Sequence, residues 1–557
     1  MRIGSPLGLP LQVTALAIGA PELGMSGTEE SVQSGLRRMR PGPVLAGVAY
    51  LLAGAEGRGG ADEHWAFVHR LYAGTPLAHR LPQLESESGA PRRLIVPRPL
   101  LRLAQLAVGQ AESNVIVTPS SLAREDLLKL VEWSLVIAEH HREAAERRRS
   151  VRLASDDIAL EMARFLWLSH PPSIGDVDRS HDVLLRHLSP LARERVDLAL
   201  KDAFGVTLDE LWNALVLNWL LASAGSGTIP PVRGPWPGHA MNKAQFQLAT
   251  DSVRQDVAQL RGAVNADIGS GSLWGYTAFR NRPITRTTNG VDLAIRPAFV
   301  GEKATLTGMF HLIAEAYRQR YGAAQYGYFA GEVGMAVDRR CRELITEATR
   351  GRARVIWEDE LSTTVTTDSR KSCDAIWMQD RRWIAMDFVH RQPSLAAQST
   401  GGVDALDSEM RVSVVDKLHQ IDETLDRMMS GAQHVKYGRP NQVLPLIVNG
   451  AGSPVMGAVE QELLESLNDE TWRCMGQDPR VLSPAVIGLD DLERAASLAS
   501  TGKTNLGSLL FRWRRSASAS ASFSFWLWSQ RDRGAVPRVP APESPSHALI
   551  RGTSAIE

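Results

Sequence analysis

Apolar positions recur every three or four residues over long parts of the first half of the chain, which predicts helices. The pattern is clear in SLAREDLLKLVEWSLVIAEHHREAAERRR, residues 121–149, and in DLALKDAFGVTLDELWNALVLNWLLASAG, residues 197–225. Residues 1–60 are rich in Gly, Pro and small side chains without such a period. Residues 225–239, GSGTIPPVRGPWPGH, interrupt the helical pattern with Gly and Pro, which is typical of a domain boundary.

The second half changes character after about residue 310. Helical spacing in 311–322 and 328–349 is followed by a strand-like run at 352–361 and by two apolar runs within 373–392. A helix is then expected at 416–431, and the last expected element is a buried strand, QVLPLIVNG, at 442–450. The expected order is therefore helix, three strands, helix, strand. Between the halves, Asn289-Gly290 predicts a turn between two short β-prone runs.

These patterns predict an α+β or α/β chain in which a helical N-terminal region precedes a core of helix, three strands, helix and strand. Five segments are expected. They are a poorly ordered segment at 1–60, a helical domain at 61–235, a mixed connecting region at 236–320, the core domain at 321–515 and a disordered, Ser- and Pro-rich tail at 516–557.

Two aspartates stand inside the apolar stretch CDAIWMQDRRWIAMDFVHRQ, residues 373–392. A turn centred on Asp380 and Arg381 pairs residues whose numbers sum to 761, and Asp374 and Asp387 satisfy that sum. The two side chains would then leave one sheet face from opposite positions, with their roots about 5 Å apart. Two bare carboxylates so close repel each other, so we expect them to share a proton, pair with a cation or bind a metal. Mg²⁺ suits oxygen ligands best.

Two other interpretations of the pair remain open. The strands could be shifted by one residue, which would send the two side chains to different faces. One aspartate could instead cap a strand end and pair with Arg382 or Arg391.

The expected order of elements, with an aspartate, a hairpin and an acid near the end of the next strand, resembles the PD-(D/E)xK, or restriction-endonuclease-like, nuclease superfamily. The resemblance covers about 321–512. It implies that Asp374 and Asp387 hold Mg²⁺ together with Glu332 of the preceding helix. It also implies that Lys417 and Gln420, in DKLHQIDETL, match a K-x-x-Q that faces the site on the following helix.

The sequence departs from the family at one position. The family expects a lysine two residues after the acid, where this chain has Val389, and strand alternation turns His390 to the opposite face. Lys417 could take over the role of that lysine. We therefore expect a nuclease-like protein that acts on or binds DNA or RNA, with weak or lost metal-dependent phosphodiesterase activity. The alternative is a non-catalytic scaffold whose helical region recognises a partner protein or nucleic acid.

Composition adds few constraints. The chain has 62 basic and 62 acidic residues, so nucleic-acid binding would need a local basic surface. Its 3 cysteines are far apart and lack metal-type spacing, which predicts a reducing compartment, and no apolar run is long enough to span a bilayer. We expect a cytoplasmic protein without a membrane segment.

Two further motifs resemble binding sequences. STGKT at 500–504 lacks the first glycine of a phosphate loop and follows a helical pattern, so we do not expect it to bind ATP. FRWRR at 511–515 mixes aromatic and basic residues, yet we expect Trp513 to close the core.

Overall fold

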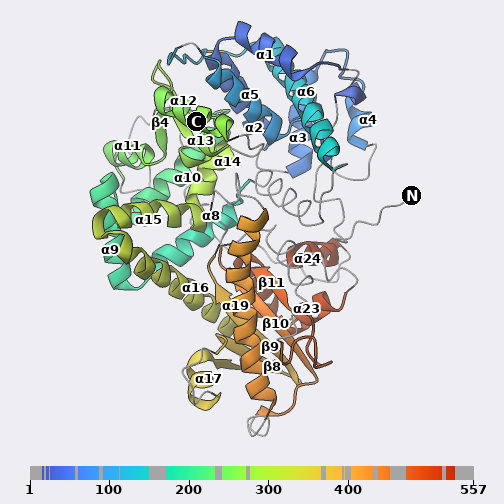
Figure 1. Cartoon of the computed structure of the whole chain (residues 1–557), viewed down its shortest axis with the longest axis vertical. Helices are drawn as coiled ribbons and strands as arrows, with labels where there is room; N and C mark the ends of the chain where they lie inside the picture. Colours follow the sequence, from blue (N-terminus) through green and yellow to red (C-terminus); the bar gives the residue numbers. More distant parts are fainter. Residues whose placement is uncertain are drawn as a thin grey trace.

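The computed structural model describes most of the chain. The described residues are 16–17, 20–23, 25–56, 60–86, 92–111, 113–149, 171–231, 241–270, 276–349, 351–365, 372–391, 394, 403–430, 437–451, 472–502, 504–516 and 522–532. They form a mixed α+β structure dominated by helices, with a five-stranded, a four-stranded and a two-stranded sheet (Figure 1). Among them, no helix has the length and apolar character needed to cross a membrane.

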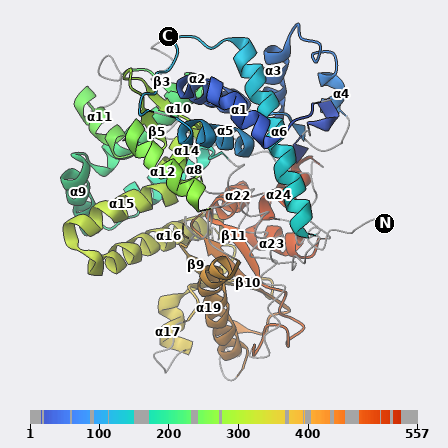
Figure 2. The same ribbon diagram turned by 45° about the horizontal axis from the view of Figure 1, so that its top comes forward.

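A helical lobe forms the N-terminal end of the molecule (Figure 2). Its helices, which share one apolar core, are α1 (Glu29–Arg38), α2 (Pro41–Ala55), α3 (Gly60–Tyr72), α4 (Leu81–Ser86), α5 (Pro97–Gly109), α6 (Arg124–Arg149), α12 (Val257–Gly269) and α13 (Thr277–Asn281). A 3-10 turn, η2 (Pro21–Leu23), and a short parallel pair, β1 (Leu16–Ala17) with β2 (Arg92–Arg93), accompany them.

The expectation of a poorly ordered segment at 1–60 is therefore wrong for α1 and α2. α2 is apolar around most of its circumference, and Leu45, Val48 and Leu51 are fully buried. Its Gly and Ala residues let neighbouring elements come close, since a Cβ on Gly47 would lie 2.4 Å from the Leu130 side chain. A helix buried on all sides shows no amphipathic period, so the sequence pattern of α2 does not indicate a helix.

A second group of helices packs against the C-terminal sheet and shares its larger core. These elements are α8 (Ile174–His181), the π-helical turn η3 (Asp182–Arg186), α9 (Pro190–Phe204), α10 (Leu208–Ala224), α11 (Lys243–Asp251), α14 (Pro297–Ala304), α15 (Leu306–Tyr321), the 3-10 turn η4 (Ala323–Gln325) and α16 (Tyr326–Thr349). Ser189, Thr207 and Asn242 cap three of them through their side chains.

The four-stranded sheet lies beside these helices. Its strands, in spatial order, are β3 (Thr228–Ile229), β6 (Asp292–Ala294), β5 (Ile284–Arg286) and β4 (Arg254–Asp256). The turn predicted at Asn289-Gly290 is confirmed, because β5 and β6 are antiparallel and Gly290 has φ +78°. The boundary expected between 235 and 236 does not separate two cores, since Ile229 and Met241 belong to the same cluster.

The five-stranded sheet has the order β11-β10-β9-β8-β7. Its strands are β7 (Arg354–Trp357), β8 (Ala375–Gln379), β9 (Arg382–Val389), β10 (Gln442–Asn449) and β11 (Ala485–Gly488). β7, β8 and β9 are antiparallel neighbours, whereas β9, β10 and β11 run parallel. The expected order of helix, three strands, helix and strand is present, and β11 extends it. A short helix, α17 (Glu358–Val365), replaces the end of the strand expected at 352–361.

The two faces of this sheet meet different helices. α19 (Val403–Met429) covers one face, where it shares a core with Trp383, Ala385 and Val389 of β9. The other face, with Ile384, Met386 and Phe388, shares its core with α16, α22 (Leu489–Ser500) and α23 (Leu506–Arg514). Alternation along β9 therefore decides which face each side chain joins.

The C-terminal expectation is partly wrong. Residues 523–532, within the tail predicted to be disordered, form α24 (Phe523–Asp532), and Phe523, Trp526 and Leu527 are buried against the core. Trp513 is also buried there, as expected, and contacts Phe523 edge to face. The SASASAS run lacks apolar periodicity and favours a prediction of disorder, and the apolar helix that follows it is too short to reverse that prediction.

Candidate active site

The β8–β9 hairpin brings the two aspartates together. Ala375 pairs with Met386 and Gln379 with Arg382, so the residues sum to 761 and the next pair outward is Asp374 with Asp387. The register prediction is confirmed, and the one-residue shift is excluded. Asp380 and Arg381 form the two-residue turn with φ of 50° and 59°, the left-handed backbone that such a hairpin requires.

Asp387 is fully buried on the α19 face of the sheet and pairs with a lysine. Its Oδ1 lies 2.7 Å from Nζ of Lys417, whose side chain is 27% exposed. Neither carboxylate oxygen accepts a well-aligned hydrogen bond from another described group. Asp387 is therefore a buried acid whose described partners are a cation and a second carboxyl, and the partner expected in the alternative interpretation, Arg382 or Arg391, is replaced by Lys417.

Asp374 lies one residue before β8 and is mostly buried. Its Oδ2 accepts a hydrogen bond from the backbone N–H of Phe388 at 2.5 Å, so it also caps the neighbouring strand. Burial and the charge of Asp387 raise its pKa to about 8, although the Phe388 N–H and Lys417 act in the opposite direction. Burial also raises the pKa of Asp387, against the influence of Lys417. With a pKa of about 8, the Asp374 carboxyl is mainly protonated near neutral pH.

Lys417 is oriented by its own helix. Nζ donates to Oε1 of Gln420 at 3.4 Å, and Nε2 of Gln420 donates to the backbone oxygen of Ser372, two residues before Asp374. The negative charge of Asp387 raises the pKa of Lys417 in spite of burial, so the ammonium is retained. The K-x-x-Q residues therefore do face the aspartates, and Gln420 ties the helix to the start of β8.

A third carboxylate, which sequence reasoning missed, belongs to this row. Trp357 of β7 pairs with Ala375 of β8, so the next pair outward is Glu358 with Asp374. The Glu358 N–H donates to the Asp374 carbonyl at 2.9 Å. Burial, and next the charge of Asp374, raise the pKa of Glu358. Glu358, Asp374 and Asp387 thus follow one another across the sheet, Glu358 directly after β7, Asp374 directly before β8 and Asp387 within β9.

Glu332 does not join this row. It lies on α16, which packs against the opposite face of the sheet, and its Oε2 accepts a hydrogen bond from Ser189 Oγ at 2.8 Å. Arg339 lies 3.8 Å from the same oxygen. The helix glutamate chosen from the sequence therefore anchors the start of α9 to α16, and no contact of the described residues links it to the aspartates.

Val389 and His390 lie where strand alternation placed them. Val389 shares the α19 face with Asp387 but is packed in the core at 8% exposure. His390 is on the other face, where its ring meets Phe310 edge to face. Val389 offers neither charge nor a hydrogen bond to the site, so Lys417 is the ammonium that the described residues supply beside Asp387.

Comparisons with known proteins were made for the whole chain. No family model, curated protein or solved structure matches it. Functional conclusions for this chain therefore rest on its own residues.

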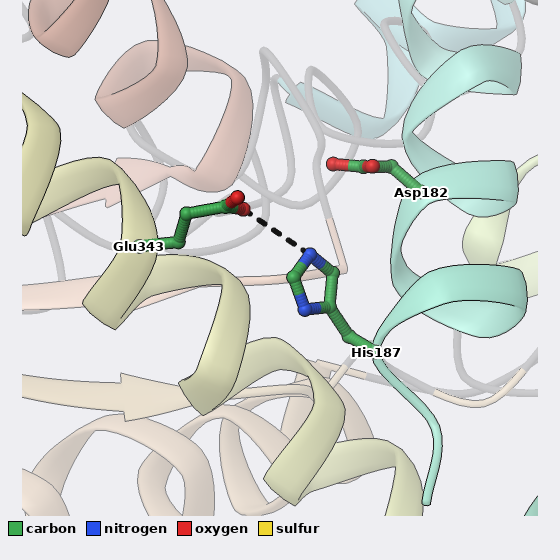
Figure 3. A group of neighbouring side chains, drawn as sticks. All are labelled: Asp182, His187 and Glu343. Carbon is green, nitrogen blue, oxygen red and sulfur yellow. Dashed lines mark ion pairs between the residues drawn. The ribbon is translucent and has the colours of Figure 1, made fainter. Parts of the chain in front are cut away.

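A second group of possible metal ligands lies between η3 and α16 (Figure 3). Asp182, His187 and Glu343 have ligand atoms within 4.8 Å of one another, and Nε2 of His187 lies 3.3 Å from Glu343. Arg340 enters the same group, with Nε 2.7 Å from Asp182 and Nη1 2.6 Å from Glu343. Because that guanidinium already neutralises both carboxylates, a divalent cation there would meet a fixed positive charge. We interpret the group as an ion-pair network that joins the two elements.

Proposed function

We propose that this chain is a divalent-metal-dependent nucleic-acid phosphodiesterase of the PD-(D/E)xK type, with Asp374 and Asp387 as its metal ligands. The observation that carries the proposal is the position of Lys417. An ammonium beside the second aspartate is what the resemblance requires, and Lys417 supplies it from α19 instead of from the position of Val389.

The residues present fit Mg²⁺ or Mn²⁺. Asp387 is a fully buried carboxylate that has no well-aligned donor among the residues that the structure describes, and Asp374 faces it across the hairpin. Carboxylate oxygens are the ligands that these hard cations prefer, and Glu358 adds a third one to the row. When bound, such a cation would polarise a phosphodiester and lower the pKa of an attacking water.

The chain's own groups would contribute in three ways. Asp374 must release its proton before it can serve as a ligand, because burial and Asp387 keep it protonated near neutral pH. Lys417 favours the ionised form of Asp387 against the effect of burial and offers a positive charge to a phosphate oxygen. Gln420 limits the motion of Lys417 by accepting from its ammonium while it donates to Ser372.

The Lys417–Asp387 ion pair supports a slow rather than a fast enzyme, for two reasons. Lys417 is held in an ion pair with Asp387, so part of its charge is already neutralised before a substrate arrives. A metal at the aspartates would have to compete with this ammonium. Positioned acid–base help is typically worth about 10²–10⁴-fold, and a partly engaged lysine would supply only part of that range.

Cleavage of labelled single-stranded and duplex DNA and RNA, with Mg²⁺, Mn²⁺ or a chelator, tests the proposal. We expect metal-dependent cleavage that is abolished in the variant carrying Asp374→Ala and Asp387→Ala and retained in Glu332→Gln. If no substrate is cut and no metal binds, the scaffold alternative takes the place of this proposal. Cleavage that persists in the double variant would refute the assigned site.

A further inference from the structure

A surface of tyrosines and arginines lies where α9, α15 and the start of α16 meet. Tyr321 and Tyr326 are partly exposed, and Tyr328 is 37% exposed. The guanidinium carbon of Arg195 lies 4.9 Å from the ring centres of both Tyr321 and Tyr328, and that of Arg318 lies 4.0 Å from the ring centre of Tyr326. We call these five residues the tyrosine–arginine surface.

The two arginines of this surface differ from their neighbours in their partners. Arg320, on α15, also lies over the Tyr321 ring, 5.4 Å from its centre, but is paired with Asp202. Arg193, on α9, is paired with Asp209 at 2.5 Å. Within the described part of the chain, no carboxylate forms an ion pair with Arg195 or Arg318, which instead rest on aromatic rings. Their charge is therefore available to an anionic partner, although the chain as a whole has no net charge.

The outer side of α16 leads from this surface toward the aspartates. Tyr328 and Arg342 are 14 residues apart on this helix, a distance of about 21 Å along its axis. A Cβ at Gly327, Gly331 or Gly334 would meet nothing within 4 Å, so this side is open. At its far end the guanidinium carbon of Arg342 lies 5.0 Å from the ring centre of Trp357, the residue before Glu358, and Arg342 interacts electrostatically with Asp374. Figure 1 shows α16 beside the five-stranded sheet.

Exposed rings combined with unpaired guanidinium groups suit unpaired bases joined by phosphates. Bases stack on tyrosine and on the planar guanidinium, and the arginine charge binds the backbone between them. A duplex offers its phosphates but hides the faces of its bases.

We infer that the tyrosine–arginine surface binds an unpaired nucleic-acid strand and holds it along α16, with its continuation directed to the aspartates. The inference rests on the proposed function, whose substrate it narrows to DNA or RNA with a single-stranded segment. The surface does not touch the metal ligands, so its residues position the strand and take no part in the chemistry.

Fluorescence anisotropy of a labelled single strand tests this inference without turnover. The titrations use the full chain carrying Asp387→Asn in a chelating buffer, so that cleavage does not interfere. We expect Tyr328→Leu to weaken binding about fivefold to a hundredfold and Tyr328→Phe, which keeps the ring, to bind like the parent. Arg195→Gln should weaken binding and reduce the slope of log affinity against log salt by about 0.7.

Arg320→Gln is the matched control. It removes the same charge from the same region, but from an arginine already neutralised by Asp202, so we expect less than a twofold change, which is about 0.4 kcal/mol. A duplex of the same sequence should bind more weakly and respond little to Tyr328→Leu. Circular dichroism melting of each variant verifies that the fold is kept.

Unchanged affinity in Tyr328→Leu and Arg195→Gln would overturn the inference, as would equal losses in Arg320→Gln or for the duplex. An effect of these substitutions on self-association alone, with strand binding intact, would also overturn it and indicate a protein interface. The two proposals fail separately. Strand binding that needs this surface without any metal-dependent cleavage refutes only the catalytic proposal, whereas Asp387-dependent cleavage that ignores the surface refutes only this one.

Discussion

Lys417 Nζ lies 2.7 Å from Oδ1 of Asp387, the ammonium coming from α19 and the carboxylate from β9. The strand itself provides only Val389 at the neighbouring position on that face. The positive charge beside Asp387 therefore comes from α19 and not from β9. The position of α19 against the sheet thus determines whether Lys417 reaches Asp387.

The Asp374 carboxyl makes the metal-free protein sensitive to pH. Its pKa is raised from 3.8 to about 8, so the folded state binds this proton more tightly than the unfolded chain. The free energy of unfolding should therefore fall as the pH rises between these values. Asp374→Asn removes this loss, and we expect the variant to be more stable than the parent by roughly 1–3 kcal/mol above pH 8 and by much less near pH 5. Urea unfolding in a chelating buffer measures the difference, and a difference independent of pH would contradict the assignment.

Replacing Lys417 should lower the unfolding free energy, because Asp387 is buried and loses its cation. Lys417→Met leaves a buried carboxylate without its cation, and because the lysine is partly exposed we expect a loss of about 1–3 kcal/mol in unfolding free energy. Adding Asp387→Asn to this variant should recover most of the loss. Lys201→Met, at an exposed lysine of α9, controls for the change of side chain. If the changes in unfolding free energy of Lys417→Met and Asp387→Asn simply added in the double variant, the two residues would not be coupled.

Substitutions at Glu358 and Glu332 test which glutamate belongs to the metal site: the structure places Glu358 beside the aspartates, whereas the sequence predicted Glu332. Glu358→Gln removes the third carboxylate of the row, so we expect Mn²⁺-dependent cleavage to fall about 10–100-fold. Glu332→Gln keeps an acceptor for Ser189 and should leave the cleavage rate unchanged. Cleavage rates of the two variants at the same metal concentration test this assignment. A large loss in Glu332→Gln with none in Glu358→Gln would make Glu332 the site residue.

The hairpin turn offers a test of stability away from the chemistry. Asp380 and Arg381 both have positive φ, which costs an L-residue roughly 1 kcal/mol at a position where glycine is free of strain. We expect Asp380→Asn with Arg381→Gly to raise the unfolding free energy by about 0.5–1 kcal/mol, because Asn-Gly suits this turn. Gly290→Ala, at φ +78° in the other hairpin, should lower it by a similar amount. Thermal melting measures both changes: the melting temperature should rise in the Asp380→Asn, Arg381→Gly variant and fall in Gly290→Ala.

Local patterns predicted the aspartate pair because every relation they needed lies within one hairpin. The turn residues and the period of two determine the register, and the register determines the faces of Asp387, Val389 and His390. Lys417 required one further step, the assumption that the following helix packs on that face. The resemblance supplied this assumption, and the 2.7 Å contact agrees with it.

The sequence did not predict the place of Glu358 in the site or the helical structure of α2, and the physical reasons differ. Glu358 joins the row only through the β7–β8 pairing, and the chain between those strands includes α17 and residues 366–371, which are outside the described part, so no short turn fixes its register. α2 is apolar on all sides, and a helix without a polar face has no period that distinguishes it from a loosely structured Gly- and Pro-rich segment. Tertiary contacts decide both cases.

Calorimetric titration with Mn²⁺ tests most directly the claim that the two aspartates form a cation site. The parent and Glu332→Gln should bind Mn²⁺ near pH 8.5, with an affinity at least about tenfold lower near pH 6.5, because Asp374 must first lose its proton. Asp387→Asn should not bind the metal at either pH. Absence of binding by the parent near pH 8.5, or equal binding by Asp387→Asn, would contradict the account.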